Sequence, residues 1–392
     1  MIARKTLCLL VCLWAGKVLF AQQQALGPQA EISVITCGAG SDLYATFGHS
    51  AFRVRDPASG VDWVYNYGTF DFNTPNFYMK FARGKLRYAL SREPFANFLY
   101  TYQLENRWVR EQLLALDSAQ KNALYRYLEE NNRPENRYYA YDFLFENCAT
   151  KIPEVLRAVL GPELEFRSDH LSGSSSFRDL IQKNLHRNSW SSLGIDLALG
   201  GVIDRDAEPA EYMFLPEYVR LQMENTLLAG APLVKRERLI LDLNHPDVHP
   251  YFTAAPLFWM LLLLAFAATI TWIDLRNGSR SRWLDFFLLL LTGACGVVIF
   301  FLWFLTDHTA TAWNANILWA FPLSIFAAWK WMLPRVPDAP WRRYILLLLL
   351  LLALCPLIWL TGLQAFSPLL LPAWLALAIR YAYLNRLLKN GI

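Results

Sequence analysis

Charged residues are almost absent from long stretches of the sequence beyond Tyr251, whereas they occur throughout residues 22–250. Hydrophobic residues make up 55% of the 392-residue chain, which is too high a share for a wholly soluble protein. Cysteine is scarce as well, because only Cys37 and Cys148 of the six fall within residues 22–250. The net charge of +4 is small and most of the excess lies in short loops beside apolar runs. We therefore expect a membrane protein with no nucleic-acid partner.

The first 21 residues have the pattern of an export signal. Arg4 and Lys5 precede an apolar stretch from Thr6 to Gly16, and Ala21 supplies a small residue before a polar segment. Lys17 interrupts the pattern, so the signal is either cleaved or kept as an anchor. Both versions export the domain that follows, which we place at residues 22–250.

Five apolar runs follow, each close to the roughly 20 residues that cross the hydrocarbon core of a bilayer. They cover residues 252–273, 284–305, 315–333, 344–362 and 367–385. Arginine and lysine cluster after the first, third and fifth runs, whereas the loops 306–315 and 362–367 contain neither. Because positively charged loops stay in the cytoplasm, residues 251–392 are predicted to form an all-α bundle of five transmembrane helices with a cytoplasmic C-terminus.

The exported domain has the composition of an α+β fold, with a small antiparallel sheet beside several helices. The predicted strands are Glu31–Thr36, His49–Arg55, Asp62–Phe72 and Lys235–Leu243. The predicted helices are Pro94–Leu104, Asn106–Leu116, Ser118–Asn131, Cys148–Leu160, Ser176–His186 and Pro216–Leu228. A Pro/Gly turn over residues 56–61 predicts that the second and third strands pair as a hairpin.

Cys148 has the surroundings of a nucleophilic cysteine. It lies just before the helical pattern of residues 151–160, and a helix N-terminus favours the thiolate over the thiol. Backbone N–H groups at this helix start are also expected to bind an oxyanion.

His49 is the base that we expect beside Cys148, because it opens a strand and Gly48 leaves room for a close approach. The predicted hairpin places a residue between Asn66 and Thr69 opposite His49, depending on the register. We choose Asn66 as the residue that orients the imidazole. Because the histidine strand precedes the cysteine helix, the opposite of the order in papain, these residues predict a permuted papain-like core.

Other interpretations of these residues stay open. Cys37 and Cys148 could form a structural disulfide, or Cys37 could itself be the nucleophile. His245 and His249 have the spacing of metal ligands, but a proline after each prevents the regular helix that would aim both at one ion. We therefore expect no metal and no cofactor. The many aromatic residues from Trp63 to Phe81 indicate core packing or packing at a membrane interface.

Six short motifs follow one another in the exported domain. They are Thr36–Gly40 with Tyr44, Thr46–Val54, Asn66–Phe72, Phe81–Leu86, Tyr141–Phe143 and Asn147–Thr150. In this order and spacing they resemble the Lnb family of bacterial lipoprotein N-acyltransferases, and they cover about half of the exported domain. One departure is Glu146, which stands where an aspartate is expected before the Asn-Cys pair.

The resemblance implies a transacylase in the bacterial inner (cytoplasmic) membrane, with the exported domain in the periplasm. Cys148, activated by His49, would take an acyl chain from a membrane phospholipid as a thioester. The chain would then pass to the N-terminal amine of a diacylglyceryl lipoprotein. Four further residues are expected to contact these substrates: Tyr44, Arg83, Asp142 and His308.

Two other functions are compatible with the same residues. A cysteine peptidase or amidase acting on cell-wall peptide would use the same papain-like core, but it does not explain why so much of the chain is embedded in the membrane. A non-enzymatic membrane assembly or sensor protein would instead carry a disulfide between Cys37 and Cys148. Thiol labelling separates these functions, because a disulfide gives no label and an active site gives one fast-reacting cysteine.

Overall fold

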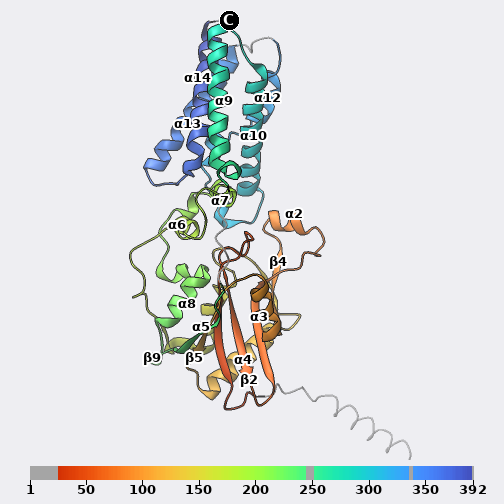
Figure 1. The fold of residues 1–392 in the computed structure, drawn as a ribbon, viewed down its shortest axis with the longest axis vertical. Coiled ribbons are helices and arrows are strands. Elements are labelled where there is room, and N and C mark those ends of the chain that lie inside the picture. Colours follow the sequence, from red (N-terminus) through yellow and green to blue (C-terminus); the bar gives the residue numbers. More distant parts are fainter. Residues whose placement is uncertain (1–24, 244–250, 335–338, 391–392) are drawn as a thin grey trace, which may run out of the picture.

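A computed structural model of the chain describes residues 25–243, 251–334 and 339–390. A sheet-containing domain forms one half of the elongated molecule and a helical bundle forms the other half (Figure 1). The predicted export signal, the pair His245 and His249, and the predicted domain boundary at residue 250 lie outside the described residues.

The exported domain is built on a seven-stranded antiparallel sheet with the order β10-β5-β1-β2-β3-β4-β6. The strands are β1 Glu31–Cys37, β2 His49–Asp56, β3 Val61–Thr69, β4 Arg87–Pro94, β5 Val109–Leu114, β6 Tyr138–Ala140 and β10 Val234–Leu241. The hairpin of β2 and β3 has the predicted turn, since Asp56 pairs with Val61. A smaller sheet joins β7 Leu164–Phe166, β8 Thr226–Leu228 and β9 Ala231–Pro232. The main sheet is thus larger than the sequence pattern indicates.

The largest departures from the predicted helices occur in two of them. Residues 109–114 of the expected helix Asn106–Leu116 form β5 instead, between β1 and β10. Glu111 on β5 is buried, accepts a hydrogen bond from Ser33 and pairs with Arg53, so charges that resemble an exposed helical face are satisfied inside the sheet. The expected helix over residues 216–228 ends early, as α8 Pro216–Glu224, because β8 follows it.

Helices cover both faces of the sheet. One face packs against α4 Ser118–Asn131, α5 Lys151–Leu160 and α8 in a core that includes Phe52 and Tyr65. The other face packs against α3 Phe95–Leu104 in a smaller cluster. The domain therefore has the predicted α+β class, and the start of α5 meets the ends of the central strands.

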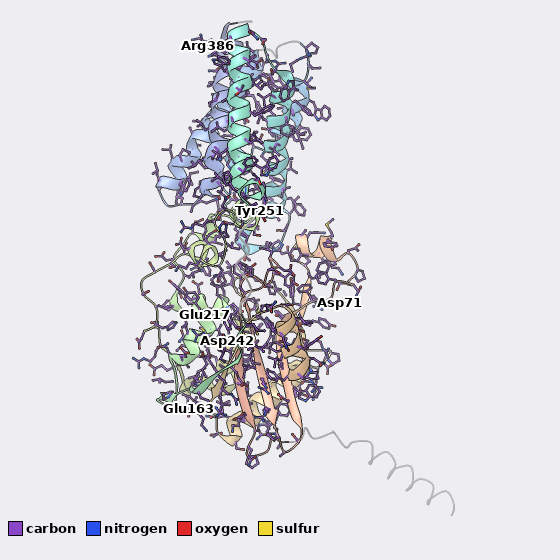
Figure 2. All side chains as sticks on the ribbon, in the orientation of Figure 1. Asp71, Glu163, Glu217, Asp242, Tyr251 and Arg386 are labelled. Carbon is purple, nitrogen blue, oxygen red and sulfur yellow. The ribbon has the colours of Figure 1, made fainter. Side chains whose placement is uncertain are left out.

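The C-terminal bundle contains α9 Pro256–Asn277, α10 Arg282–Phe304, α11 Asn316–Trp319, α12 Ser324–Trp331, α13 Ala339–Leu360 and α14 Leu371–Asn390. Tyr251 lies at the end of the bundle nearest the sheet domain and Arg386 at the far end (Figure 2). Among the described residues, three helices are long and apolar enough to cross a membrane: α9, α10 and residues 340–360 of α13. The third predicted span is divided into α11 and α12, and the fifth forms the more polar α14. The number of five spans stays a prediction.

A layer formed by α6 Phe177–Gln182 and α7 Trp190–Ala198 connects the sheet domain with the bundle (Figure 1). The N–H of Gly200, just after α7, donates to the carbonyl of Ala310 in the loop that follows α10, at 2.9 Å. A Cβ atom on Gly200 would lie 1.8 Å from the carbonyl oxygen of Ala312, so only glycine fits at this contact. These contacts fix residues 308–314 of the bundle against the exported domain.

Candidate active site

Cys148 lies in a tight turn just before α5, and the buried side chain of Asn147 holds that turn. The Asn147 Oδ1 atom accepts hydrogen bonds from the N–H groups of Ala149 and Thr150, at 2.8 and 2.9 Å. Its Nδ2 atom donates to the carbonyls of Phe143 and Phe214. All the hydrogen-bonding capacity of this amide is therefore used to place the neighbouring cysteine.

The same turn corrects our expectation about the oxyanion. The N–H groups of Ala149 and Thr150 are occupied by Asn147, and those of Lys151 and Ile152 donate to backbone carbonyls of the turn. The helix start therefore has no spare donor at residues 149–152. The N–H of Cys148 itself lies beside its own sulfur.

His49 and Asn66 lie together beside Cys148. The His49 Nε2 atom lies 3.2 Å from Asn66 Oδ1, and the His49 side chain also hydrogen-bonds to the Cys148 sulfur. Asn66 Nδ2 in turn donates to Glu93 Oε1 on β4, at 3.0 Å. The predicted trio is thus brought together, and Glu93 extends it to a chain of four side chains.

A distortion of β3 makes room for the cysteine. The pairing of β3 with β4 shifts register between Asn66 and Thr69, and Gly68 within this bulge has a φ of +85°. A Cβ atom on Gly68 would lie 3.5 Å from the Cβ of Cys148. Glycine therefore lets the backbone adopt this conformation directly against Cys148.

The electrostatics of the site favour a charged pair. Burial alone would raise the pKa of Cys148, but His49 and the N–H of Ser50 together lower that pKa below the ordinary value of a thiol. Burial alone would likewise lower the pKa of His49, but the Cys148 thiolate and the hydrogen bonds to Cys148 and Asn66 raise it. Each group stabilises the charged form of the other, so the site favours a thiolate beside an imidazolium more than either group would alone.

Tyr139 on β6 carries a hydroxyl that is buried beside this pair. A Cβ atom on Gly68 would lie 3.5 Å from the Cβ of Cys148 and 4.0 Å from the Tyr139 hydroxyl. Cys148 and the Tyr139 hydroxyl therefore lie close to the same point beside Gly68. No hydrogen bond of normal geometry satisfies this hydroxyl within the described residues. Burial raises the pKa of Tyr139, so the hydroxyl keeps its proton at neutral pH and is available as a donor.

The pair opens on a cavity of about 550 Å³ between the sheet domain and the bundle. The lining is mostly apolar and includes Phe47, Tyr67, Phe70, Leu86, Tyr88 and Phe143. Residues 308–311, from the loop after α10, close one side of it. The volume is within the range of about 300–1,000 Å³ that is typical of small-molecule sites.

Of the four predicted substrate contacts, Tyr44, Asp142 and His308 line this cavity, whereas Arg83 does not. Asp142 accepts a hydrogen bond from Thr309 at 2.6 Å, and the His308 Nε2 atom lies 3.0 Å from the Phe81 carbonyl. Asp142 and His308 therefore join the exported domain to the bundle as well as facing the cavity. The side chain of Arg83 is exposed at the surface.

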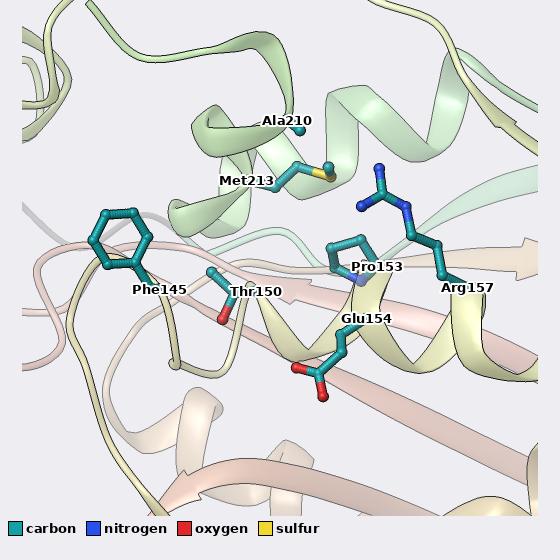
Figure 3. Close-up of a pocket in the computed structure, with 7 residues that line it drawn as sticks. All are labelled: Phe145, Thr150, Pro153, Glu154, Arg157, Ala210 and Met213. Carbon is teal, nitrogen blue, oxygen red and sulfur yellow. The ribbon is translucent and has the colours of Figure 1, made fainter. Parts of the chain in front are cut away.

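A smaller cavity of about 270 Å³ lies beside α5 (Figure 3). Its lining consists of Phe145, Thr150, Pro153, Glu154, Arg157, Ala210 and Met213. It contains neither a cysteine nor a histidine, so it offers no nucleophile and base. The apolar cavity at Cys148 is the stronger candidate for a reaction site.

Two family models match this chain. The model of the Lnb N-terminal periplasmic domain matches residues 20–183, and the model of the Lnb transmembrane domain matches residues 249–391. Together they cover well over half of the chain. The chain belongs to the Lnb family. No curated protein and no solved structure matches it.

Membership in the Lnb family indicates a lipoprotein-modifying protein of the inner membrane, with its sheet domain in the periplasm and its bundle in the bilayer. This agrees with the localisation that the sequence predicts for residues 22–250. It also indicates a role in enzymatic lipoprotein processing.

The second exported cysteine of this Lnb-family protein lies in quite different surroundings. Cys37 is a free, buried thiol in the cluster beneath α3, whereas Cys148 is a free thiol that packs against the core on the opposite face of the sheet. The disulfide that one alternative requires is therefore not formed. Burial raises the pKa of Cys37 far above the ordinary value, which also disfavours it as a nucleophile.

The described residues contain no cluster that could hold a metal ion.

Proposed function

We propose that this Lnb-family protein is an acyltransferase that moves an acyl chain from a phospholipid to the N-terminal amine of diacylglyceryl lipoproteins. The observation that carries the proposal is a cysteine–histidine pair facing an apolar cavity at the junction with the membrane bundle. The order of a histidine strand before a cysteine helix supports the proposal of a permuted papain-like core.

In the first half of the reaction, the Cys148 thiolate attacks the carbonyl carbon of a phospholipid ester. The tetrahedral intermediate collapses, the ester C–O bond breaks, and the lysophospholipid oxygen takes the proton from the His49 imidazolium. The acyl chain remains on Cys148 as a thioester. Asn66 holds the imidazole ring for this proton transfer, and Glu93 holds Asn66.

In the second half, the α-amino group of the lipoprotein attacks the thioester carbonyl. His49 takes the proton that the amine loses, the C–S bond breaks, and the amide leaves with the Cys148 thiolate restored. An α-amine has a pKa of about 8, so a useful fraction is neutral at pH 7 and needs no strong activation. The apolar cavity supports this order of events, because a thioester exposed to water would be hydrolysed.

Each tetrahedral intermediate carries an oxyanion that needs donors. The N–H of Cys148 is one of them, and we assign the second to the Tyr139 hydroxyl, which is buried and unsatisfied near the sulfur. This assignment replaces the helix-start N–H groups, which are already occupied.

The proposed topology has five spans, with α11 and α12 together as the third and α14 as the fifth. An odd number of crossings places the C-terminus in the cytoplasm, opposite the periplasmic domain. The positively charged residues after the first, third and fifth apolar runs support this orientation. Both proposed substrates are anchored in the membrane, so they reach the site by lateral diffusion.

The deciding experiment is mass spectrometry of lipoprotein N-terminal peptides from cells that lack the protein and carry a replacement gene. We expect N-acylated peptides with the wild type and free α-amines with Cys148→Ala, because removal of a nucleophile lowers such rates by at least about 10³-fold. Cys37→Ala is the matched control and should behave as the wild type. Wild-type N-acylation by a folded, inserted Cys148→Ala protein would overturn the mechanism.

A further inference from the structure

The segment of residues 70–87, here called the α2 segment, contains the short helix α2 Phe77–Ala82 and has an unusually apolar surface. Phe72, Tyr78, Met79 and Phe81 are between 53% and 79% exposed. Phe77 points the other way and is buried with Leu86 and Tyr88 against the domain. The segment therefore has an inner face that attaches it to the protein and an outer apolar face that no described residue covers.

The position of α2 relative to the bilayer follows from its contacts with α10. This helix has 23 residues, which corresponds to about 34 Å at 1.5 Å per residue, so it crosses the roughly 30 Å hydrocarbon core with little to spare. Asp307, just after its end, donates its N–H to the Arg83 carbonyl at 3.0 Å. Figure 1 shows α2 beside the end of α10 that faces the sheet domain. The α2 segment thus lies at the periplasmic boundary of the hydrocarbon core.

The contact between the α2 segment and the loop after α10 is close. Gly84 has a φ of +68°, and a Cβ atom there would lie 3.2 Å from backbone atoms of Asp307 and His308. Lys85 also pairs with Asp307, at 3.7 Å. The apolar surface of the segment is therefore held at a fixed height relative to the spans.

The charges of the α2 segment suit a phospholipid surface. It contains four basic residues and one acidic residue, Asp71. The basic residues are Lys80, Arg83, Lys85 and Arg87. Basic side chains beside exposed aromatic ones are the combination that binds phosphate headgroups while the rings enter the interface. Arg83, which does not reach the cavity, is well placed for such a headgroup contact.

The α2 segment also forms part of the wall of the active-site cavity. Phe81, Gly84 and Leu86 line that cavity from one side, and residues 308–311 line it from another. The apolar surface that faces the membrane is therefore continuous with the apolar lining that leads toward Cys148.

The geometry points to a contact with the membrane that also guides a lipid toward the active site. We infer that the α2 segment lies in the periplasmic leaflet of the membrane, and that a phospholipid acyl chain passes along its apolar surface into the cavity that leads to Cys148. The second half of this inference rests on the proposed function, whereas the first half stands without it.

Lipid-phase quenching tests the membrane contact. The full chain in phosphatidylethanolamine and phosphatidylglycerol vesicles carries an environment-sensitive fluorophore at Tyr78→Cys or Met79→Cys, in a Cys148→Ala background. Tyr100→Cys on α3 is the matched control, because Tyr100 is an exposed tyrosine of the same domain. We expect phospholipids with a spin label on the acyl chain to quench the first two positions at least twofold more than the control. Equal quenching at all three positions would overturn the inference.

The passage of the acyl chain needs a second measurement. The double variant Tyr78→Glu with Met79→Glu should slow acylation of Cys148 by vesicle phospholipid about tenfold, because each glutamate opposes burial in the interface. Tyr100→Glu should acylate at the wild-type rate. Alkylation of Cys148 by iodoacetamide, which needs no membrane, verifies that the site of the double variant is folded.

The outcomes are separable. Unchanged acylation in a folded double variant would contradict passage beside the α2 segment. If the wild type itself forms no acyl-enzyme from phospholipid, the proposed function fails and so does the passage of its substrate. The quenching result would still decide whether the segment lies in the membrane, because that measurement requires no reaction.

Discussion

The surroundings of Cys37 and of Cys148 differ in how far they favour the thiolate form. Cys37 is the strand partner of His49 across β1 and β2, yet only Cys148 hydrogen-bonds to the His49 side chain. Burial opposes the thiolate at both positions. At Cys148 the imidazole and a backbone N–H outweigh burial, whereas at Cys37 nothing does. In this domain the pKa of a buried thiol therefore depends on the groups that face the sulfur more than on the depth of burial.

The tyrosine hydroxyls beside the two cysteines also differ from each other. The Tyr102 hydroxyl is engaged with Cys37, so that pair is satisfied within the core. The Tyr139 hydroxyl beside Cys148 has no hydrogen-bond partner of normal geometry in the described residues. The Cys37 thiol thus has a hydroxyl partner within the core, whereas the hydroxyl beside Cys148 is the donor that we propose for the oxyanion.

The largest expected effect comes from His49→Ala, which removes the main difference between the two cysteines. We expect the formation of acyl-enzyme to fall about 10²- to 10⁴-fold. The pH dependence changes as well. In the wild type the rate of Cys148 alkylation should rise with pH through a pKa below the ordinary value of a thiol, because His49 favours the thiolate. In the variant burial remains and the imidazole is gone, so the rise should move above that value. Iodoacetamide kinetics from pH 5 to 10 measure this shift, and identical profiles would exclude His49 as the partner.

Removal of the spare donor should have the next largest effect. Tyr139→Phe keeps the ring and its packing but deletes the hydroxyl, so acyl transfer should fall about 10²-fold. The alkylation rate of Cys148 should change little, because alkylation forms no oxyanion. Tyr102→Phe beside Cys37 is the matched control and should leave acyl transfer near the wild-type rate. Equal losses in both variants would contradict a specific role for Tyr139.

The orienting residues should contribute less. Asn66→Ala leaves His49 in place without its Nε2 partner, so we expect acyl-enzyme formation to fall about tenfold. Glu93→Gln keeps an acceptor for the Asn66 amide and should cost less than that. Single-turnover measurement of thioester formation checks both values. A larger loss in Glu93→Gln than in Asn66→Ala would show that the carboxylate acts in some other way.

The smallest effect is expected at the inert cysteine. Cys37→Ala removes one buried sulfur atom and should destabilise the exported domain by about 1 kcal/mol without changing acyl transfer. Thermal unfolding of the full chain in detergent, together with the acylation rate, tests both statements. A loss of transfer in a stable Cys37→Ala protein would remove the distinction between the two thiols.

The sequence predicted the residues that local patterns reveal. Cys148 follows from its place before a helix, and Asn66 follows from the length of the hairpin turn, since both depend on residues near them in the chain. Glu93 and Tyr139 were missed because they come from β4 and β6, whose places beside β3 are set by long-range strand pairing. The only local signal for either is a polar group within a strand-like pattern.

The misassigned helix at residues 106–116 has the same physical origin. Its charged residues are typical of a solvent-exposed helix. In the structure, however, Ser33 and Arg53, which are far away in the sequence, bind Glu111 inside the sheet. The role of Asn147 was missed for a related reason. The asparagine stands next to the cysteine in the sequence, but one of its acceptors, the Phe214 carbonyl, lies far along the chain.

The Asn147 turn also bears on the timing of events at the site. Because its amide is fully bonded within the protein, the loop that carries the sulfur needs no hydrogen bond from a lipid to hold its shape. In an enzyme of this kind the nucleophile is already in position before the substrates bind. None of the binding energy of the substrates is then needed to position it. The choice of substrate then depends on which molecules can enter the cavity, and the composition of the surrounding membrane contributes to that choice.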